Sequence, residues 1–292
     1  MSKTNKSLSI IITNSMQNDF IEPLDSLKTT KKGNTIKLDF LKCQELWINY
    51  FKNQTGDIND ATVDKFIIWL EKNAKTQNIA TPIPYNGILN KYKHRVHVDY
   101  DETQRLWEDG KLEQFIRDLM KKFTNSSENT NDTEEIQCIH LRDWHDTTDI
   151  EQKGEMDLFG VHCIKGTYGA KFISPLNQLI HEHPEYNIVI NCNSLSSFGE
   201  TDLESVLDTI MKNAGSSKNE VNIVVLGVIT NVKIFLLAFE LIVIHKFKNV
   251  YVCSDFCAGF IKQGHETGIS DMANILAANV VDYSKIRKIF KL

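Results

Sequence analysis

A lysine stands where a helix is predicted to begin, in the stretch VVLGVITNVKIFLLAFE that spans residues 224–240. Its apolar, β-branched first half predicts a buried strand and its second half a helix, which places Lys233 in the first helical turn. Unpartnered N–H groups and the helix dipole give this end of a helix partial positive charge. The position suits a thiolate, a phosphate or a carboxylate, so an ammonium there needs a stabilising anion or loses its proton.

Cysteine is the other residue type with reactive potential. The six cysteines show neither metal-type pairing nor the density of a disulfide scaffold, so we expect a reduced, cytoplasmic protein. The N-terminal apolar run, residues 8–12, is too short for a signal core, and the longest apolar run, 234–244, is shorter than the ~20 residues of a membrane span. With a net charge of −5 we expect neither nucleic acid nor membrane as partner.

Six short apolar segments rich in β-branched residues must position these side chains. Their nearly continuous apolar character is typical of strands buried on both faces, as in a parallel sheet, and helical patterns lie between them. The alternation predicts an α/β fold, a three-layer sandwich with a six-stranded, mainly parallel sheet. The strands are expected at residues 8–13, 136–141, 186–191, 222–228, 249–254 and 279–283, and helices at 202–214, 231–245 and 265–278.

Two segments interrupt this alternation within a single domain, residues 1–292. Residues 22–100 form an insertion after the first strand, and its patterns at 36–52 and 61–75 predict helices. The aromatic stripe of the insertion is typical of a core, with a docking surface as the alternative. Residues 124–135, TNSSENTNDTEE, are polar and predict a flexible loop.

Four segments in order resemble the isochorismatase-like cysteine hydrolases, which include nicotinamidases. They are SIIITNSMQNDFIEP (9–23), IHLRDWHD with HCIKGTYGAKF (139–146 and 162–172), NCNSLSSFGETDLESVL (191–207) and LGVITNVKIFLLAFE (226–240). The resemblance implies a six-stranded parallel sheet with the active site at the carboxyl ends of its strands, as is general for open α/β sheets. It also implies a cis peptide between Val228 and Ile229, and homo-oligomers.

The resemblance places the family's catalytic triad at three substituted positions. The family attacks small amides and related bonds with a cysteine, assisted by an aspartate and a lysine, because a free thiol is little ionised near neutrality. This chain has Ser15 in place of the aspartate, Cys192 in place of the lysine and Lys233 in place of the nucleophile. The usual hydrolase mechanism is therefore unsupported, and no catalytic residue is assigned.

Our first hypothesis is a pseudoenzyme that binds a small anionic metabolite or acts in regulation. The helix N–H groups and Lys233 would converge on the anion. The expected ligand-binding residues are Ser15, Phe20, Cys192, Ile229, Thr230 and Lys233. In the plainer alternative, the Lys233 tip reaches water or a carboxylate of the insertion or of a second subunit, and the Ser15 hydroxyl bonds nearby backbone.

Two further hypotheses stay open. In one, Cys192 is a relocated nucleophile for small amide or ester substrates, with Lys233 lowering its pKa. In the other, the chain is a scaffold whose insertion, 22–100, is an interaction surface.

The motif RDWHD supplies two weak metal-ligand candidates. Nicotinamidases hold a metal with an aspartate and histidines, and Asp143 and His145 have a compatible spacing. The further histidine expected shortly afterwards is absent, with Asp149 in that neighbourhood. We therefore interpret the motif as a hydrogen-bonded strand-end cluster and expect no metal or other cofactor.

Overall fold

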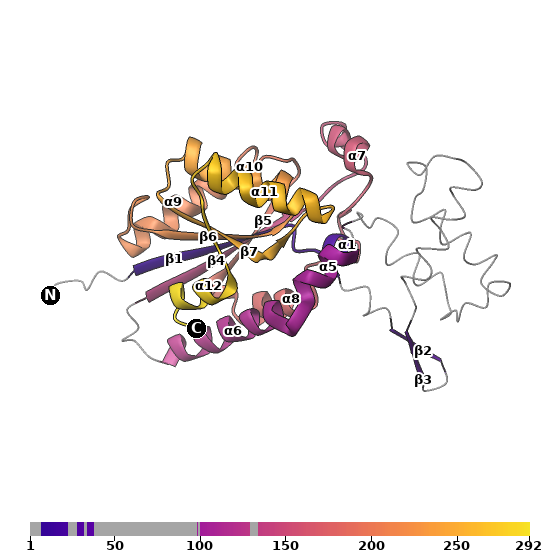
Figure 1. Ribbon diagram of the computed structural model, residues 1–292, viewed down its shortest axis with the longest axis horizontal. Coiled ribbons are helices and arrows are strands. Elements are labelled where there is room, and N and C mark those ends of the chain that lie inside the picture. The colour runs from indigo at the N-terminus through magenta and orange to yellow at the C-terminus, as the bar shows by residue number, and fades with distance from the viewer. Residues whose placement is uncertain (1–6, 23–27, 32–33, 38–97, 99, 129–133) are drawn as a thin grey trace.

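The fold is centred on a parallel sheet with strand order β5-β4-β1-β6-β7-β8 (Figure 1). The computed structural model describes residues 7–22, 28–31, 34–37, 98, 100–128 and 134–292. Every pair of neighbouring strands in this sheet is parallel, which confirms the predicted α/β class. Chain order runs outward from β1 to β5 and then returns to β6 on the other side of β1, so the sheet switches direction beside β1.

The strands lie close to the predicted segments. They are β1 (Ser7–Asn14), β4 (Glu134–Asp143), β5 (Asn187–Cys192), β6 (Asn222–Val228), β7 (Asn249–Ala258) and β8 (Asn279–Val281). The helices around them are α1 (Asn18–Ile21), α5 (Tyr100–Trp107), α6 (Lys111–Glu128), α7 (Lys153–Phe159), α8 (Ser174–Glu182), α9 (Leu203–Ala214), α10 (Phe235–Phe239), α11 (Lys262–Asn274) and α12 (Tyr283–Ile289). Short 3₁₀ turns span Glu108–Gly110 and Pro184–Tyr186.

Two apolar cores, one on each face of the sheet, explain why the strands are apolar almost throughout. Successive side chains of a strand point to opposite faces. Accordingly Ile10 and Ile12 pack with residues of α9, α10 and α11, whereas Ile11 packs with residues of α6, α8 and α12. Figure 1 shows the same three layers, with α7 standing beyond the carboxyl ends of the strands.

The helix that carries Lys233 is less regular than predicted. It begins with a π-helical turn, Thr230–Ile234, continues as α10 and ends with a second π-helical turn, Glu240–Ile244. Lys233 therefore belongs to a π-helical turn, and π-helical turns frequently occur at functional sites.

The two predicted interruptions differ in part from expectation. Within 22–100, the chain forms a two-stranded antiparallel sheet of β2 (Lys28–Lys31) and β3 (Asn34–Lys37), where β-branched Thr and Ile residues favour strand over helix. The helical patterns at 38–52 and 61–75 lie outside the described residues. The loop predicted at 124–135 is wrong at both ends, because α6 continues to Glu128 and β4 begins at Glu134.

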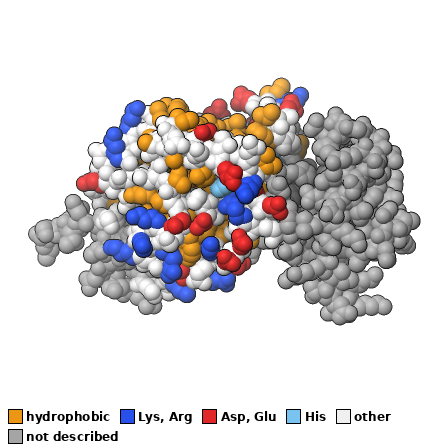
Figure 2. Space-filling model, in the orientation of Figure 1, with side chains coloured by type: hydrophobic (Ala, Val, Ile, Leu, Met, Phe, Trp, Pro, Cys, Tyr) orange, Lys and Arg blue, Asp and Glu red, His pale blue; other side chains and the backbone are white. Residues whose placement is uncertain are grey.

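Neither sign of charge dominates the face of the molecule shown in Figure 2. On the face shown in Figure 2, acidic and basic side chains are interspersed over the sheet-containing part of the molecule. Among the described helices, none is both long and apolar enough to cross a membrane.

Candidate functional site

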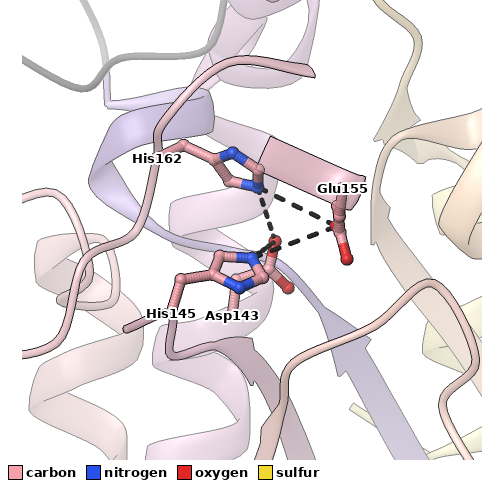
Figure 3. Close-up of side chains that lie close together, drawn as sticks. All are labelled: Asp143, His145, Glu155 and His162. Atoms are coloured by element: carbon pink, nitrogen blue, oxygen red, sulfur yellow. Dashed lines mark ion pairs between the residues drawn. The ribbon is translucent and has the colours of Figure 1, made fainter. Parts of the chain in front are cut away.

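The carboxyl ends of three adjacent strands bring the candidate residues together. Ser15 follows β1, Asp143 ends β4, and Lys233 lies in the π-helical turn after β6. Because β4 and β6 flank β1, these side chains meet at the switch point of the sheet, where open α/β proteins bind their ligands. Glu155 of α7 reaches the same point from above, as Figure 3 shows.

Lys233 is buried and paired with two carboxylates. Its Nζ lies 2.6 Å from Asp143 Oδ2 and 3.0 Å from Glu155 Oε1, and the residue is only 5% exposed. Burial alone would lower the pKa of Lys233, but Asp143 and then Glu155 outweigh burial and raise it above its usual value. The lysine is therefore a protonated cation rather than a nucleophilic amine.

This pairing contradicts the expectation that the Lys233 ammonium is unpaired, and it agrees in part with the alternative that its tip reaches a carboxylate. Lys233 is not an unpaired ammonium at a helix terminus, because β4 and α7 each supply a carboxylate. The alternative expectation, that the lysine tip reaches a carboxylate, agrees with these contacts. However, the two carboxylates belong to neither the insertion nor a second subunit.

Asp143 is the centre of the cluster. Ser15 Oγ lies 3.1 Å from Asp143 Oδ1 and 2.9 Å from Asn14 Oδ1, so its single proton faces side chains and not the backbone that we expected. Burial would raise the pKa of Asp143, but Lys233, followed by the nearby imidazoles of His145 and His162, holds it well below its usual value. Asp143 is therefore an ionised carboxylate.

Two buried imidazoles point one nitrogen each into the cluster (Figure 3). His145 Nδ1 lies 3.2 Å from Gln152 Oε1, an oxygen that also accepts from Asp146 N, so His145 Nδ1 must be the donor. His162 Nδ1 likewise donates to Gly160 O at 2.7 Å. In neutral rings with these tautomers, both Nε2 atoms present lone pairs toward Asp143 and Glu155.

These nitrogens lie close to carboxylate oxygens. His162 Nε2 is 3.3 Å from Asp143 Oδ2 and His145 Nε2 is 3.9 Å from it, while both are 4.0 Å from Glu155 Oε1. A lone pair facing a carboxylate is unfavourable unless a cation lies between them. Burial would lower the pKa of His162, but the adjacent Asp143 outweighs burial and raises it, because only the protonated ring could donate an Nε2–H to this carboxylate.

The two cysteines near the cluster remain protonated thiols. Burial, assisted by Asp143, raises the pKa of Cys192 to about 12 in spite of Lys233. Burial also raises the pKa of Cys163 well above its usual value, and both residues are buried. Neither thiol has the depressed pKa that an attacking cysteine requires.

A set of hydrogen bonds fixes the frame around the cluster. Gln17 donates to Asp143 O at 2.7 Å and to Ala170 O at 2.9 Å, and its Oε1 accepts from Asp143 N at 2.7 Å. Asp19 Oδ2 accepts from Cys163 N at 2.8 Å. A Cβ on Gly169 would lie 2.0 Å from the Asp19 carboxylate, so this close approach requires glycine.

The remaining predicted pocket residues are buried around the cluster. Phe20 packs edge-on against His162 with ring centroids 5.3 Å apart. Thr230 Oγ1 lies 3.0 Å from His265 Nδ1, which turns its hydroxyl toward α11. The peptide between Val228 and Ile229 is cis, as the resemblance implied.

Sequence reasoning missed two members of the cluster. Asp143 and His145 were proposed as weak metal candidates, whereas Glu155 and His162 were not. His162 stood in the quoted motif HCIKGTYGAKF, which was a usable signal, and Glu155 occupies the region where a further ligand was sought. Asp149, the residue noted there, instead accepts from Gln152 Nε2 at 2.7 Å and so supports His145 indirectly.

The family follows from a profile match. The profile of the Isochorismatase domain matches residues 107–282, more than half of the chain. The chain therefore belongs to the isochorismatase family. None of the curated proteins compared with the chain matches it.

Three solved structures are similar to the chain at low sequence identity. An isochorismatase-like hydrolase from Alkaliphilus metalliredigens is 18% identical, covers 97% of this chain and 99% of its own, and has a TM-score of 0.49. A nicotinamidase/pyrazinamidase from Bacillus subtilis is 23% identical over 57% of this chain and 84% of its own, with a TM-score of 0.43. The pyrazinamidase of Pyrococcus horikoshii, in complex with zinc, is 17% identical over 94% of this chain and 99% of its own, with a TM-score of 0.46.

The donor set fits a divalent metal ion. One donor atom from each of Asp143, His145, Glu155 and His162 lies within 4.8 Å of the others. Two imidazole nitrogens with two carboxylate oxygens suit zinc and similar borderline cations, and each imidazole is oriented by a hydrogen bond from its other nitrogen, as metal-binding histidines usually are. Within the described part of the chain, the buried His145 Nε2 has no hydrogen-bond partner, and a bound cation would satisfy it.

Proposed function

We propose that this isochorismatase-family protein is a pseudoenzyme: it has lost the cysteine-dependent hydrolysis of the family and has a binding or regulatory role. The observation that carries the proposal is the ion pairing of Lys233. At the position that matches the nucleophile, a protonated ammonium lies 2.6 Å from Asp143 and 3.0 Å from Glu155. A protonated lysine has no lone pair with which to attack a carbonyl carbon.

The alternative hypothesis, in which Cys192 is a relocated nucleophile, is less well supported. Cys192 lies beside Asp143 in the register of β4 and β5, so the nearest carboxylate opposes thiolate formation while Lys233 is already neutralised. With a pKa raised to about 12, Cys192 is overwhelmingly a thiol near neutral pH. The observed contacts therefore support binding over turnover.

The contacts also favour a different ligand charge from the one first expected. An anion on Lys233 would have to displace carboxylates that already neutralise it. Two carboxylates and one ammonium leave one negative charge in excess, and the raised pKa of His162 also indicates that this position favours positive charge. These charges support a small cation at this position and remove the reason for expecting an anionic metabolite.

A divalent metal ion is the cation that the donors fit best. Asp143, His145, Glu155 and His162 would hold it. When bound, such an ion supplies Lewis acidity and lowers the pKa of a coordinated water molecule. This chain's own residues would orient the imidazoles, through Gln152 and the Gly160 carbonyl, and exclude solvent through burial.

The test is a direct assay of hydrolysis. Purified protein, with and without added Zn²⁺, is incubated with a panel of small amides and esters that includes nicotinamide. We expect no turnover above the uncatalysed rate, and iodoacetamide labelling of Cys192 at pH 7 far slower than that of glutathione. Appreciable turnover that disappears in Cys192→Ser would refute the proposal and establish the relocated nucleophile.

Self-association and a scaffold role for residues 22–100 stay predictions. Most of this segment lies outside the described residues. Sedimentation analysis of the full chain measures the oligomeric state directly.

A further inference from the structure

Lys233 contacts the same oxygen atoms that a metal ion would need. The carboxylate donors of the four-residue cluster are Asp143 and Glu155, and the Lys233 Nζ lies 2.6 Å from Oδ2 of the first and 3.0 Å from Oε1 of the second. The imidazoles in Figure 3 aim at these same two oxygens. Both kinds of cation therefore have one set of partners.

The charge of the cluster allows one of them at a time. Asp143 and Glu155 together carry two negative charges, which a divalent ion would balance completely when both imidazoles offer lone pairs. A divalent ion together with the Lys233 ammonium would leave one uncompensated positive charge in a buried site, where unpaired charges are strongly unfavourable.

We propose that Lys233 is a tethered cation that competes with a divalent metal ion for Asp143 and Glu155 and thereby sets the metal affinity of the site. The proposal rests on the proposed function and adds to it the residue that controls metal binding at the same site. Its readout is metal affinity, whereas the proposed function is tested by turnover, so either can fail while the other stands.

The geometry favours Lys233 over a metal ion in this competition. Lys233 is covalently attached and already within contact distance, so its effective concentration at the carboxylates is high. Lys233 contacts Asp143 Oδ2 and Glu155 Oε1, while the buried Nε2 of His145 has no hydrogen-bond partner among the described residues. A metal ion would use both the oxygens and the nitrogens, so loss of the ammonium exposes a complete four-donor site.

The experiment measures metal affinity in variants of the full-length chain. Wild type, Lys233→Met and Lys233→Arg are titrated with Co²⁺, followed by its visible d–d absorption, and with Zn²⁺ by chelator competition. We expect Lys233→Met to bind both ions at least tenfold more tightly than wild type, because a nearby positive charge has been removed. Lys233→Arg keeps the charge and should bind as weakly as wild type.

Two controls separate this site from adventitious binding. Lys262→Met removes an exposed lysine, 77% accessible, and should leave the affinity unchanged. His145→Ala in the Lys233→Met background removes one donor and should abolish the gain. Equal affinities of wild type and Lys233→Met would overturn the proposal, as would a gain that survives His145→Ala.

Folding provides a second readout if Lys233→Met is unstable. In chelator the variant has two buried carboxylates without a cation, and saturating Zn²⁺ should raise its melting temperature far more than that of wild type. If the variant is unfolded without metal, folding on addition of Zn²⁺ supports the competition. Failure to fold in saturating Zn²⁺ while Lys233→Arg folds would overturn it.

Discussion

Two carboxylate–cation groups close the carboxyl end of the sheet, and they are satisfied to different degrees. In α5, Arg105 donates to both carboxylate oxygens of Glu102 at 2.7 and 3.1 Å. Its guanidinium also donates to Cys257 O at 2.5 Å, while Glu102 accepts from Gly259 N at 3.0 Å. All of these hydrogen bonds of the pair are made within the protein, to each other or to backbone groups.

The Lys233 cluster is different. Among the described residues, His145 Nε2 and Glu155 Oε2 have no hydrogen-bond partner although both atoms are buried. Buried polar atoms are nearly always paired, so a saturated cluster fits a structural role, whereas unsatisfied atoms can accept a further bonding partner. The comparison identifies the Glu102–Arg105 pair as a connection between α5 and β7, and it supports the binding role that we propose for the Lys233 cluster.

The largest effect should follow from removing the lysine. In chelator, Lys233→Met leaves Asp143 and Glu155 buried without a cation, and we expect a loss of about 3–5 kcal/mol in the free energy of unfolding. Urea unfolding measures it. Lys262→Met, which breaks only an exposed pair with Glu266, should change stability by less than about 0.5 kcal/mol. A loss below about 1 kcal/mol in Lys233→Met would show that the cluster is not a buried ionic network.

Removing Arg105, the cation of the Glu102–Arg105 pair, should lower the free energy of unfolding by a smaller amount, and added metal should not restore it. Arg105 has a side chain 29% exposed, so solvent partly compensates, and Arg105→Met should destabilise the protein by about 2 kcal/mol. Urea unfolding with and without Zn²⁺ should give the same value, because within the described residues no set of metal donors converges on Glu102. Recovery of Arg105→Met by Zn²⁺ to the extent seen for Lys233→Met would erase the distinction between the two groups.

A buried histidine on β4 extends the comparison to pH. His140 resembles the saturated pair, because Thr13 Oγ1 lies 2.9 Å from Nδ1 and Asn187 Oδ1 lies 2.8 Å from Nε2. Burial lowers the pKa of His140 to about 4, whereas the unfolded chain has a value near 6.5. Below pH 6.5 the unfolded state therefore binds the extra proton, and stability falls as pH falls from 6.5 toward 4.

The expected contribution of His140 is a loss of about 2 kcal/mol in the free energy of unfolding between pH 7 and pH 5. The raised pKa of His162 acts in the opposite direction, so the measurement is the difference in urea unfolding between wild type and His140→Gln at the two pH values. The variant should lose the His140 share of the pH dependence. Identical pH dependence in the two proteins would show that His140 titrates normally in the folded state.

The strands and the matched site positions could be predicted from the sequence because they depend on local pattern. Short β-branched runs located all six strands of the main sheet, and the signature segments placed Ser15, Cys192 and Lys233 at strand ends. Parallel strands collect such ends at one edge, so their proximity follows from topology. The likeness of the chain to its family was visible at the same level.

The partners of Lys233 could not be predicted in this way. Glu155 comes from α7, whose position depends on the path of the loop after β4, and no local pattern fixes that path. The pairing of Asp143 with Lys233 joins residues 90 positions apart in sequence. The motif RDWHD drew attention to the metal-binding residue types, but convergence of four side chains is a property of the folded chain alone.

Gln17 has a consequence for how disturbances travel through the molecule. A single carboxamide grips both backbone groups of Asp143 and the carbonyl of Ala170, so the end of β4 and the glycine-containing loop cannot shift independently. A displacement of that loop should therefore also displace Asp143, because the planar carboxamide of Gln17 is hydrogen-bonded to both. Gln17 thus couples the backbone position of the buried Ala170 to that of Asp143.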